Sequence, residues 1–323
     1  MNKRVLIIRW NNLGDVVMAL PTAATVRASQ PNVTLGWFVD ARFRELVQDN
    51  PHIDTVFAFD RGRFRGRELD PFSWRLYWKN LMQPRRFNPD VVICLRGHLR
   101  ETISVAFSGA KERYTLQPRG MLATLLGGKA VHPEKDRHVV ERFLDVVEAA
   151  GFSKRIYDFY LPISPEDSKF VDSRLGSGGW VTLHLGSGDP KKVWPPERYA
   201  IVAERLRAEG LRVVLLGGPG EEPLRDRFLH FTKAEDFVGR TTLLQLAETI
   251  RRSRLHISND SGSAHIAAAL GVPCVTIFGR KRACVYHPFR QPEAVIEAGG
   301  NVLAVQPEEV VEKCFERLEL APV

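Results

Sequence analysis

The stretch NDSGSAHIAAALGVPCVTIFG, residues 259–279, decides the fold of this chain. Residues 254–258 before it and 272–278 at its end are predicted to be buried strands, and the alanine-rich segment between them predicts a helix. We expect this helix to begin near Ser261. A strand, a helix and a second strand in this order form a βαβ unit, which is the building block of a parallel sheet.

The start of this helix predicts a phosphate site. The first backbone amides of a helix have no partner inside it, and the positive end of the helix dipole lies there. Gly262 lets a ligand approach the backbone, Asp260 or Ser261 is suited to cap the helix, and His265 lies one turn further on. In the alternative interpretation Asp260 only caps the helix and His265 is a half-buried histidine without a ligand.

The same alternation of strands and helices runs along all 323 residues and predicts an α/β protein with two mostly parallel sheets. A chain of this length favours two domains of about 150 residues each, which we place at 1–165 and 166–323. Residues 151–179, with GSGG at 176–179, are predicted to contain the linker. Ligands of such sheets bind at the carboxyl ends of the strands, so we expect the site in the cleft between the domains. The predicted strands are 4–8, 33–39, 55–59, 91–95, 180–185, 212–217, 255–258 and 272–278, and the predicted helices are 16–29, 41–49, 71–82, 138–150, 196–209, 221–230, 242–252 and 307–318.

The composition indicates the charge of the binding partner and the cellular compartment. The net charge of +8 favours an anionic partner, whether nucleotide, phosphorylated glycan, membrane surface or nucleic acid. The four cysteines are far apart and form no CxxC pair, so we expect reduced thiols and neither a zinc site nor a disulfide framework. No stretch is apolar enough to span a bilayer and no signal peptide precedes the first strand, which predicts a cytoplasmic protein.

The first strand is followed by RWNNLGDVVMALP, residues 9–21, which places Asp15 at the start of a predicted helix. A carboxylate at the end of a strand is suited to accept a proton from an acceptor hydroxyl. An aspartate in this position is also a common helix cap or first-turn acid, so both interpretations remain open.

Two further turns carry candidate ligand residues. In HLGSGDPKKVWPPERY, residues 184–199, Ser187 lies in a turn, and Lys191 or Lys192 offers a compact positive charge for a diphosphate leaving group unless both are merely solvated. In VVLLGGPGEEPLRD, residues 213–226, the glycines do not match GxGxxG, which argues against a dehydrogenase. Glu221 or Glu222 would receive ribose hydroxyls or, alternatively, complement a helix dipole.

LGD, KVWP, GGPGE and NDSGSAHIAAALG, in this order and spacing, make the chain resemble glycosyltransferase family 9, the ADP-heptose:lipopolysaccharide heptosyltransferases. The resemblance extends over nearly the whole length. It implies a GT-B fold, in which two Rossmann-like domains face each other across a cleft. The N-terminal domain would bind the acceptor and the C-terminal domain the nucleotide sugar, expected to be ADP-heptose. Transfer would invert the anomeric centre and require no metal ion or other cofactor.

The resemblance also implies roles for individual residues. Asp15 would be the general base and Lys192 would stabilise the departing diphosphate. Glu221 would hold the ribose, and Thr241 would lie beside the adenine through its backbone. The remaining donor-binding residues, which would hold the phosphates and the donor sugar, are Ser187, Asp260, Ser261, Gly262 and His265.

A basic segment with interleaved aromatic residues, 60–78, resembles segments of these enzymes that face an acidic, lipid-linked acceptor. Arginine suits phosphate and carboxylate contacts, so we expect an acidic glycan or glycolipid acceptor here and peripheral contact with the cytoplasmic face of the inner membrane, unless the segment is a solvated loop. The arginines concerned are Arg61, Arg63, Arg65 and Arg67.

Other interpretations remain at this stage. Family members commonly have a GPT-like turn where this chain has Arg280, Lys281 and Arg282 after Gly279, and no role is assigned to these three residues. Another GT-B enzyme with a UDP- or GDP-sugar, or an epimerase of similar shape, is one rival. A basic nucleic-acid or membrane-binding protein without catalysis is another, but no recognition-helix, RNP or zinc-finger signature accompanies the charge, so we expect no nucleic-acid partner.

Overall fold

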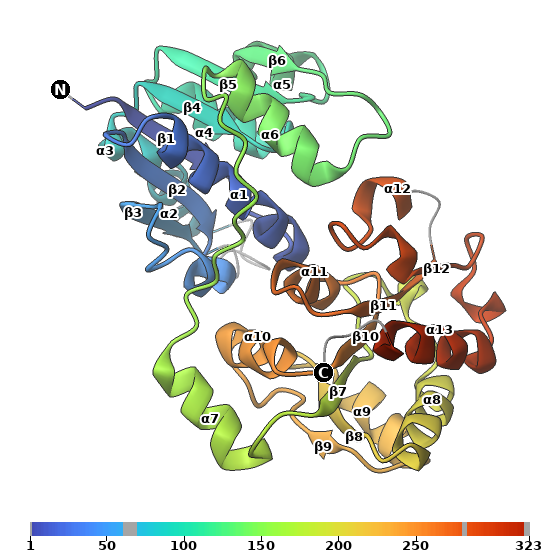
Figure 1. Cartoon of the computed structure of the whole chain (residues 1–323). Coiled ribbons are helices and arrows are strands. Elements are labelled where there is room, and N and C mark those ends of the chain that lie inside the picture. The colour runs from blue at the N-terminus through green and yellow to red at the C-terminus, as the bar shows by residue number, and fades with distance from the viewer. Residues whose placement is uncertain (1, 61–69, 280–282, 320–323) are drawn as a thin grey trace. The chain divides into compact units, whose positions relative to one another are not determined.

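The computed structural model describes residues 2–60, 70–279 and 283–319. The chain divides into two compact units, Met1–Pro162 and Ile163–Val323, and each is built around one parallel sheet (Figure 1). The predicted α/β class is therefore confirmed. Two predicted groups lie outside the described residues. They are the four arginines expected to contact the acceptor, Arg61, Arg63, Arg65 and Arg67, and the three basic residues after Gly279, Arg280, Lys281 and Arg282.

The sheet of the first unit has the strand order β3-β2-β1-β4-β5-β6, with parallel pairing between all neighbours. Its described strands are β1 (Arg4–Ile8), β2 (Thr34–Asp40), β3 (Thr55–Phe59), β4 (Val91–Cys94), β5 (Glu112–Leu116) and β6 (Lys129–Val131). Its described helices are α1 (Leu13–Ser29), the 3₁₀ helix η1 (Ala41–Leu46), α2 (Pro71–Leu81), α3 (Gln83–Phe87), α4 (Leu99–Phe107), α5 (Met121–Gly127) and α6 (Val139–Ala149).

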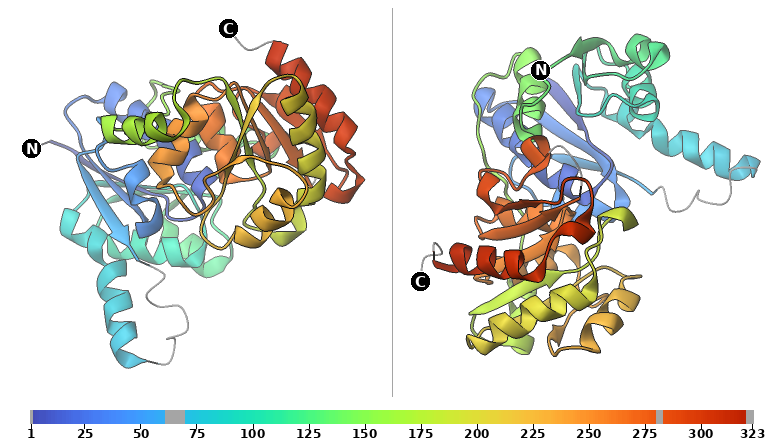
Figure 2. Two further views of the ribbon diagram at one scale, coloured as in Figure 1. Left: turned by 90° about the horizontal axis from the view of Figure 1, so that it is seen from below. Right: turned by 90° about the vertical axis from the view of Figure 1, so that its right-hand side faces the viewer.

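The sheet of the second unit has the order β12-β11-β10-β7-β8-β9, again with parallel neighbours, and α8 and α13 lie side by side on it (Figure 2). Its described strands are β7 (Trp180–His184), β8 (Arg212–Leu216), β9 (Glu235–Asp236), β10 (Leu255–Asn259), β11 (Cys274–Phe278) and β12 (Val295–Glu297). Its α-helices are α7 (Pro165–Leu175), α8 (Pro196–Ala208), α9 (Glu222–Leu229), α10 (Leu243–Arg251), α11 (Gly262–Ala269), α12 (Ala283–Tyr286) and α13 (Pro307–Glu319), and its 3₁₀ helices are η3 (Pro190–Lys192), η4 (Pro292–Ala294) and η5 (Val302–Ala304).

The expected secondary structure has two large errors: no element was predicted where α4, β5, α5 and β6 lie, and the predicted linker region contains a helix. Helix α7 occupies Pro165–Leu175 within it, and the GSGG run lies inside the second unit. The helix begins with a capping box, in which the Ser164 side chain accepts from the Asp167 amide and the Asp167 carboxylate accepts from the Ser164 amide. Its two buried apolar residues, Val171 and Leu175, are too few to produce a helical period in the sequence.

Both sheets share one topology, and this topology positions the candidate site. Counted from its own first strand, each sheet has the order 3-2-1-4-5-6, so the direction of winding reverses between β1 and β4 and between β7 and β10. In parallel α/β sheets the loops that follow the two strands at such a reversal point diverge and leave a crevice for ligands. The central strands are buried on both faces, since every residue of β7 and β10 is inaccessible or nearly so.

Within the described part of the chain no helix is both long and apolar enough to cross a membrane. All four cysteines are unpaired, as their spacing predicted, and three of them are buried.

Candidate active site

The loops that follow β7 and β10 are joined at the carboxyl edge of the second sheet. The Asn259 side chain accepts a hydrogen bond from the amide of Trp194 at 3.0 Å and donates one to the carbonyl of Leu185 at 2.6 Å. The Ser187 hydroxyl donates to the backbone carbonyl of Asp260 at 3.2 Å. A buried amide side chain thus fixes the position of the loop that carries Ser187 relative to the start of α11.

Lys192 and Asp260, predicted separately from two motifs, form an ion pair whose side chains are 19% and 14% exposed. Asp260 therefore does not cap α11. Ser261, the other predicted cap, occupies the N-cap position, but its side chain makes no capping hydrogen bond. An α11 start without a side-chain cap, beside a lysine ammonium, is an electropositive site for an anion.

The other two predicted residues of this segment lie on α11 itself. Gly262 is the first residue of the helix, and His265 follows within its first turn with 7% of its surface exposed. Gly262 leaves the backbone at the helix start uncovered by a side chain, as a bound phosphate requires.

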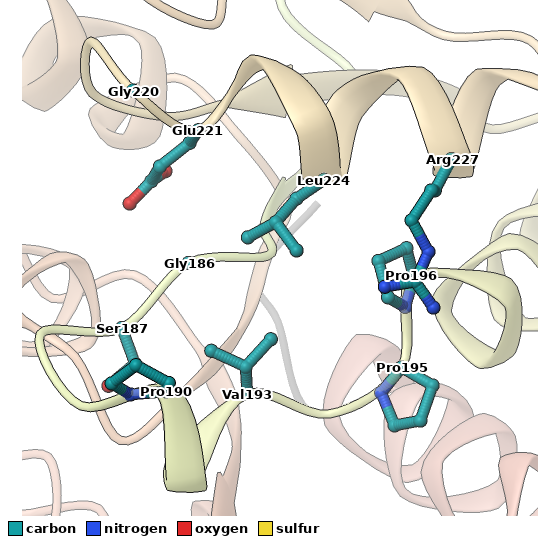
Figure 3. Close-up of a pocket in the computed structure, with 10 residues that line it drawn as sticks. All are labelled: Gly186, Ser187, Pro190, Val193, Pro195, Pro196, Gly220, Glu221, Leu224 and Arg227. Carbon is teal, nitrogen blue, oxygen red and sulfur yellow. The ribbon is translucent and has the colours of Figure 1, made fainter.

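Glu221 lies at the rim of a pocket of about 460 Å³ next to this site (Figure 3). Its Oε2 accepts hydrogen bonds from His184 Nε2 at 2.9 Å and from the Gly218 amide at 3.2 Å. Burial alone would raise the pKa of Glu221, but these hydrogen bonds and the neighbouring His184 lower it below its usual value. Glu222, the other candidate, accepts instead from the Gly220 amide. The pocket is lined by Gly186, Ser187, Pro190, Val193, Pro195, Pro196, Gly220, Glu221, Leu224 and Arg227.

Thr241 lies between β9 and α10, and no hydrogen bond in the described chain joins it to these residues. Its hydroxyl oxygen is buried and has no hydrogen-bond partner among the residues that the structure describes. The predicted contact of its backbone with a base stays a prediction.

In the first unit Asp15 lies in the first turn of α1, directly after β1. Its Oδ2 forms an ion pair with Arg9 and accepts a hydrogen bond from Asn12 Nδ2 at 2.9 Å. The Asp15 side chain is 16% exposed and that of Arg9 only 5%. Asn12 is the N-cap residue, so Asp15 does not cap the helix, but the interpretation of Asp15 as a first-turn acid is confirmed. Two donors hold its carboxylate in this turn, and part of its surface is accessible to solvent.

Several cations gather at the same edge of the first sheet. Arg96 follows β4 and lies 3.9 Å from the buried carboxylate of Glu101. Burial and the nearby charge of Arg9 lower the pKa of Arg96, and Arg96 Nη1 is buried without a hydrogen-bond partner in the described chain. Burial, together with Arg96 and Arg119, also lowers the pKa of His98. An anionic group of a ligand would find unsatisfied donors here.

The comparisons with known proteins identify the family. The model of glycosyltransferase family 9 (heptosyltransferase) matches residues 78–313. The chain belongs to this family. A lipopolysaccharide heptosyltransferase 1 of Escherichia coli O18:K1:H7 is 25% identical over 308 residues, which are 93% of each chain. A protein of the same name from Pseudomonas aeruginosa is 27% identical over 288 residues, which are 85% of this chain and 78% of that one.

Solved structures of family 9 glycosyltransferases share the fold. A family 9 glycosyl transferase from Veillonella parvula aligns with a TM-score of 0.83 at 23% identity, over 99% of this chain and 98% of that one. E. coli heptosyltransferase WaaC with ADP aligns with a TM-score of 0.82 at 21% identity, over 97% and 99%. The predicted GT-B fold is therefore confirmed, and the chain is a glycosyltransferase.

Sequence reasoning missed four residues of these networks in the family 9 enzyme: Arg9, His184, His256 and Ser263. His184 was interpreted only as part of a strand, and Arg9 only as the first residue of the motif that follows the first strand. His256 and Ser263 are completely buried, and polar residues surround both in the sequence, so nothing in the local pattern distinguished them.

His256 predicts how the stability of the enzyme depends on pH. Burial and the nearby His184 lower the pKa of His256 to about 3. Because an unfolded histidine has a pKa of about 6.5, only the unfolded state takes up this proton between the two values. The free energy of unfolding should therefore fall as the pH falls from 6.5 towards 3, with up to about 1.4 kcal/mol per pH unit from this residue.

Denaturant unfolding at several pH values measures this slope. His256→Asn should flatten it over this range, whereas His132→Asn, at an exposed site, should not. An unchanged slope in His256→Asn would show that other groups cause the acid destabilisation.

Proposed function

We propose that this enzyme transfers a heptose from ADP-heptose to a hydroxyl of a lipopolysaccharide inner-core or related acidic glycan, with inversion at the anomeric carbon. The observation that carries the proposal is the start of α11 without a side-chain cap, with the Lys192 ammonium beside it, because free backbone amides and an ammonium both favour a diphosphate. The proposal also draws on relatives named lipopolysaccharide heptosyltransferase and on a neighbour solved with ADP-2-deoxy-2-fluoro heptose.

The proposed reaction is a single displacement. The acceptor oxygen attacks the anomeric carbon, the bond from that carbon to the diphosphate oxygen breaks, and its electron pair leaves with ADP. Asp15 takes the proton of the acceptor hydroxyl, and Lys192 offsets the charge that develops on the diphosphate. In this proposal the first unit binds the acceptor, the second binds the donor, and the domain boundary lies near residue 165.

The donor residues have distinct parts in this proposal. The α11 start with Asp260, Ser261 and Gly262 receives the phosphates and His265 lies against the donor sugar. Glu221 accepts from the ribose and Ser187 borders the nucleoside pocket, where a Thr241 backbone contact with adenine would complete the selection of the base. Because Lys192 supplies the positive charge at the leaving group, we propose that no metal ion is required.

The test is incubation with ADP-heptose and a heptose-deficient lipopolysaccharide core in the presence of EDTA, followed by mass spectrometry. A gain of one heptose residue supports the proposal. No gain with ADP-heptose, together with a gain from another nucleotide sugar, would overturn the assignment of the donor. A thermal-shift series with ADP, UDP and GDP tests the base separately, since a bound ligand raises the apparent stability.

We further propose that the first unit contacts the membrane that carries the acceptor. Helices α4 and α5 pack together and expose aliphatic side chains: Leu99 (40%), Met121 (90%), Leu122 (51%) and Leu125 (75%). The exposed cations Arg100 and Arg119 flank these residues, and the Arg119 amide bonds to the Gly97 carbonyl after β4, at the edge that carries Asp15. Cations beside exposed apolar side chains fit an anionic lipid surface.

Vesicle sedimentation tests this surface. With vesicles of phosphatidylethanolamine and phosphatidylglycerol, Met121→Ser combined with Leu125→Ser should weaken binding about 10-fold, because roughly 1.5–3 kcal/mol accompanies burial of each such side chain and burial here is partial. Ile201→Ser, at an exposed site of the second unit, is the matched control. Equal binding by all variants, or concentration-dependent dimerisation that only the double substitution abolishes, would refute the membrane assignment.

A further inference from the structure

We infer that His184 is a positioning residue that holds Glu221 in place and, through Ser263, links the ribose-binding carboxylate to the phosphate-binding start of α11. This inference rests on the proposed function, in which Glu221 holds the ribose. His184 is the last residue of β7, and its side chain is 11% exposed. Its two ring nitrogens reach two elements that are far apart in the sequence.

The hydrogen bonds of His184 have a defined direction towards Glu221. Nε2 lies 2.9 Å from Glu221 Oε2, and Nδ1 lies 2.8 Å from Ser263 Oγ. An ionised carboxylate only accepts hydrogen bonds, so His184 Nε2 carries the proton. With a neutral imidazole, Nδ1 is then the acceptor, and the Ser263 hydroxyl donates to it.

The chain of hydrogen bonds continues behind Ser263 into the core. Ser263 Oγ lies 2.9 Å from His256 Nε2, and His256 Nδ1 lies 3.0 Å from Thr182 Oγ1. Since Ser263 donates to His184, it accepts from His256 Nε2, and His256 Nδ1 accepts from Thr182. Every donor in this series points towards Glu221, so its orientation is supported by fully buried groups on β7, β10 and α11.

Two glycines confine the Glu221 carboxylate on its other side. A Cβ atom on Gly186 would lie 1.9 Å from Glu221 Oε1, and one on Gly217 would lie 2.6 Å from Oε2. The carboxylate therefore lies directly against the backbone at the ends of β7 and β8. Among the residues that the structure describes, Oε1 accepts no hydrogen bond, which leaves it for a ribose hydroxyl at the pocket rim (Figure 3).

Ser263 also contacts the start of α11, where the phosphates are proposed to bind. Ser263 Oγ lies 2.9 Å from the hydroxyl of Ser261, the N-cap residue of α11. His184 and Ser263 thus fix the distance between the Glu221 carboxylate, which would accept hydrogen bonds from the ribose, and the start of α11, which would bind the phosphates. Loss of His184 should release Glu221 and weaken the binding of nucleotides that carry ribose hydroxyls, with little effect on nucleotides that lack them.

The test compares the dissociation constants of ADP and 2′,3′-dideoxy-ADP by isothermal titration calorimetry. The wild-type enzyme should prefer ADP about 10-fold or more, since a hydrogen bond to a charged group contributes roughly 1.5–3 kcal/mol. In His184→Leu this preference should fall to about 3-fold or less, as expected when the carboxylate is no longer held. His184→Gln should restore most of it, because its amide can donate to Glu221 and accept from Ser263.

A second pair of variants displaces the carboxylate without changing the histidine. Gly186→Ala should reduce the preference as His184→Leu does, and Gly188→Ala, where nothing lies within 4 Å of the added Cβ, should leave it unchanged. A wild-type preference retained in both His184→Leu and Gly186→Ala would overturn the inference and leave the proposed function intact. A wild-type enzyme that binds no ADP would overturn both.

Discussion

Asp15→Asn is expected to lower kcat about 1,000-fold, within the range that a general base contributes, and to change the dissociation constant of ADP by less than about 3-fold. The amide keeps the shape of the carboxylate but cannot take the proton of the acceptor hydroxyl. The proposed donor residues Lys192, Glu221 and Asp260 belong to the other unit, so the contacts proposed between them and ADP should persist. Heptose transfer followed by mass spectrometry, with ADP binding measured by calorimetry, checks both halves of this prediction.

The matched control is Asp54→Asn. Asp54 belongs to the same unit and forms an ion pair with Arg27 at 2.7 Å. Asp54→Asn therefore also removes the carboxylate partner of an arginine. This control should retain near-wild-type kcat. If Asp15→Asn retains full activity, Asp15 is not the base; if both variants lose activity equally, the loss reflects the first unit's stability and not proton transfer.

The central strands could be predicted from the sequence because they are buried on both faces. Strands such as β1 and β4 are largely apolar runs, and their observed bounds lie within one residue of the predicted ones. β5 was missed because Glu112, Arg113 and Thr115 leave it without an apolar run, although three of its residues are buried. The edge strands were missed because they are short and accessible. β6, β9 and β12 have only two or three residues each, and none of these residues is buried. Their pairing depends on the neighbouring strand and not on their own composition.

Helix starts were less predictable than helix positions. α1 begins at Leu13, three residues before its predicted start, because Asn12 adopts φ 63° and lets the chain turn from β1 directly into the helix. The predicted helix over 41–49 is the shorter 3₁₀ helix η1. Such starts depend on backbone dihedral angles that the apolar period does not report.

Individual residues of the candidate site could be predicted from the sequence, but the pairs that they form could not. The local motifs indicated Lys192, Glu221 and Asp260, because their chemistry and their place after strands can be recognised within a short window. Their partners come from other strands: Lys192 pairs with a carboxylate 68 residues away, and Glu221 with a histidine 37 residues away. These pairings are set by the order and register of β7, β8 and β10, which no short motif contains.

Lys192→Ala is expected to lower kcat by about 100-fold or more and to weaken ADP binding about 10-fold, in line with the loss of one preorganised charge or charged hydrogen bond. In the proposed reaction the lysine has two effects. It offsets the charge on the leaving diphosphate, and it neutralises Asp260, whose carboxylate would otherwise repel the same phosphates. Heptose transfer kinetics and ADP calorimetry measure the two effects separately. Lys191→Ala, at the exposed neighbouring lysine, is the control and should change neither quantity.

The double variant Lys192→Ala with Asp260→Asn separates repulsion from catalysis. Removing both charges relieves the repulsion of the phosphates, so the double variant should bind ADP more tightly than Lys192→Ala does, although the hydrogen bond from the ammonium is still lost. kcat should stay low, because no positive charge remains at the diphosphate when the bond to the sugar breaks. Recovery of kcat together with affinity would mean that Lys192 acts only by neutralising Asp260. In that case the backbone amides at the start of α11 would be the groups that stabilise the leaving diphosphate.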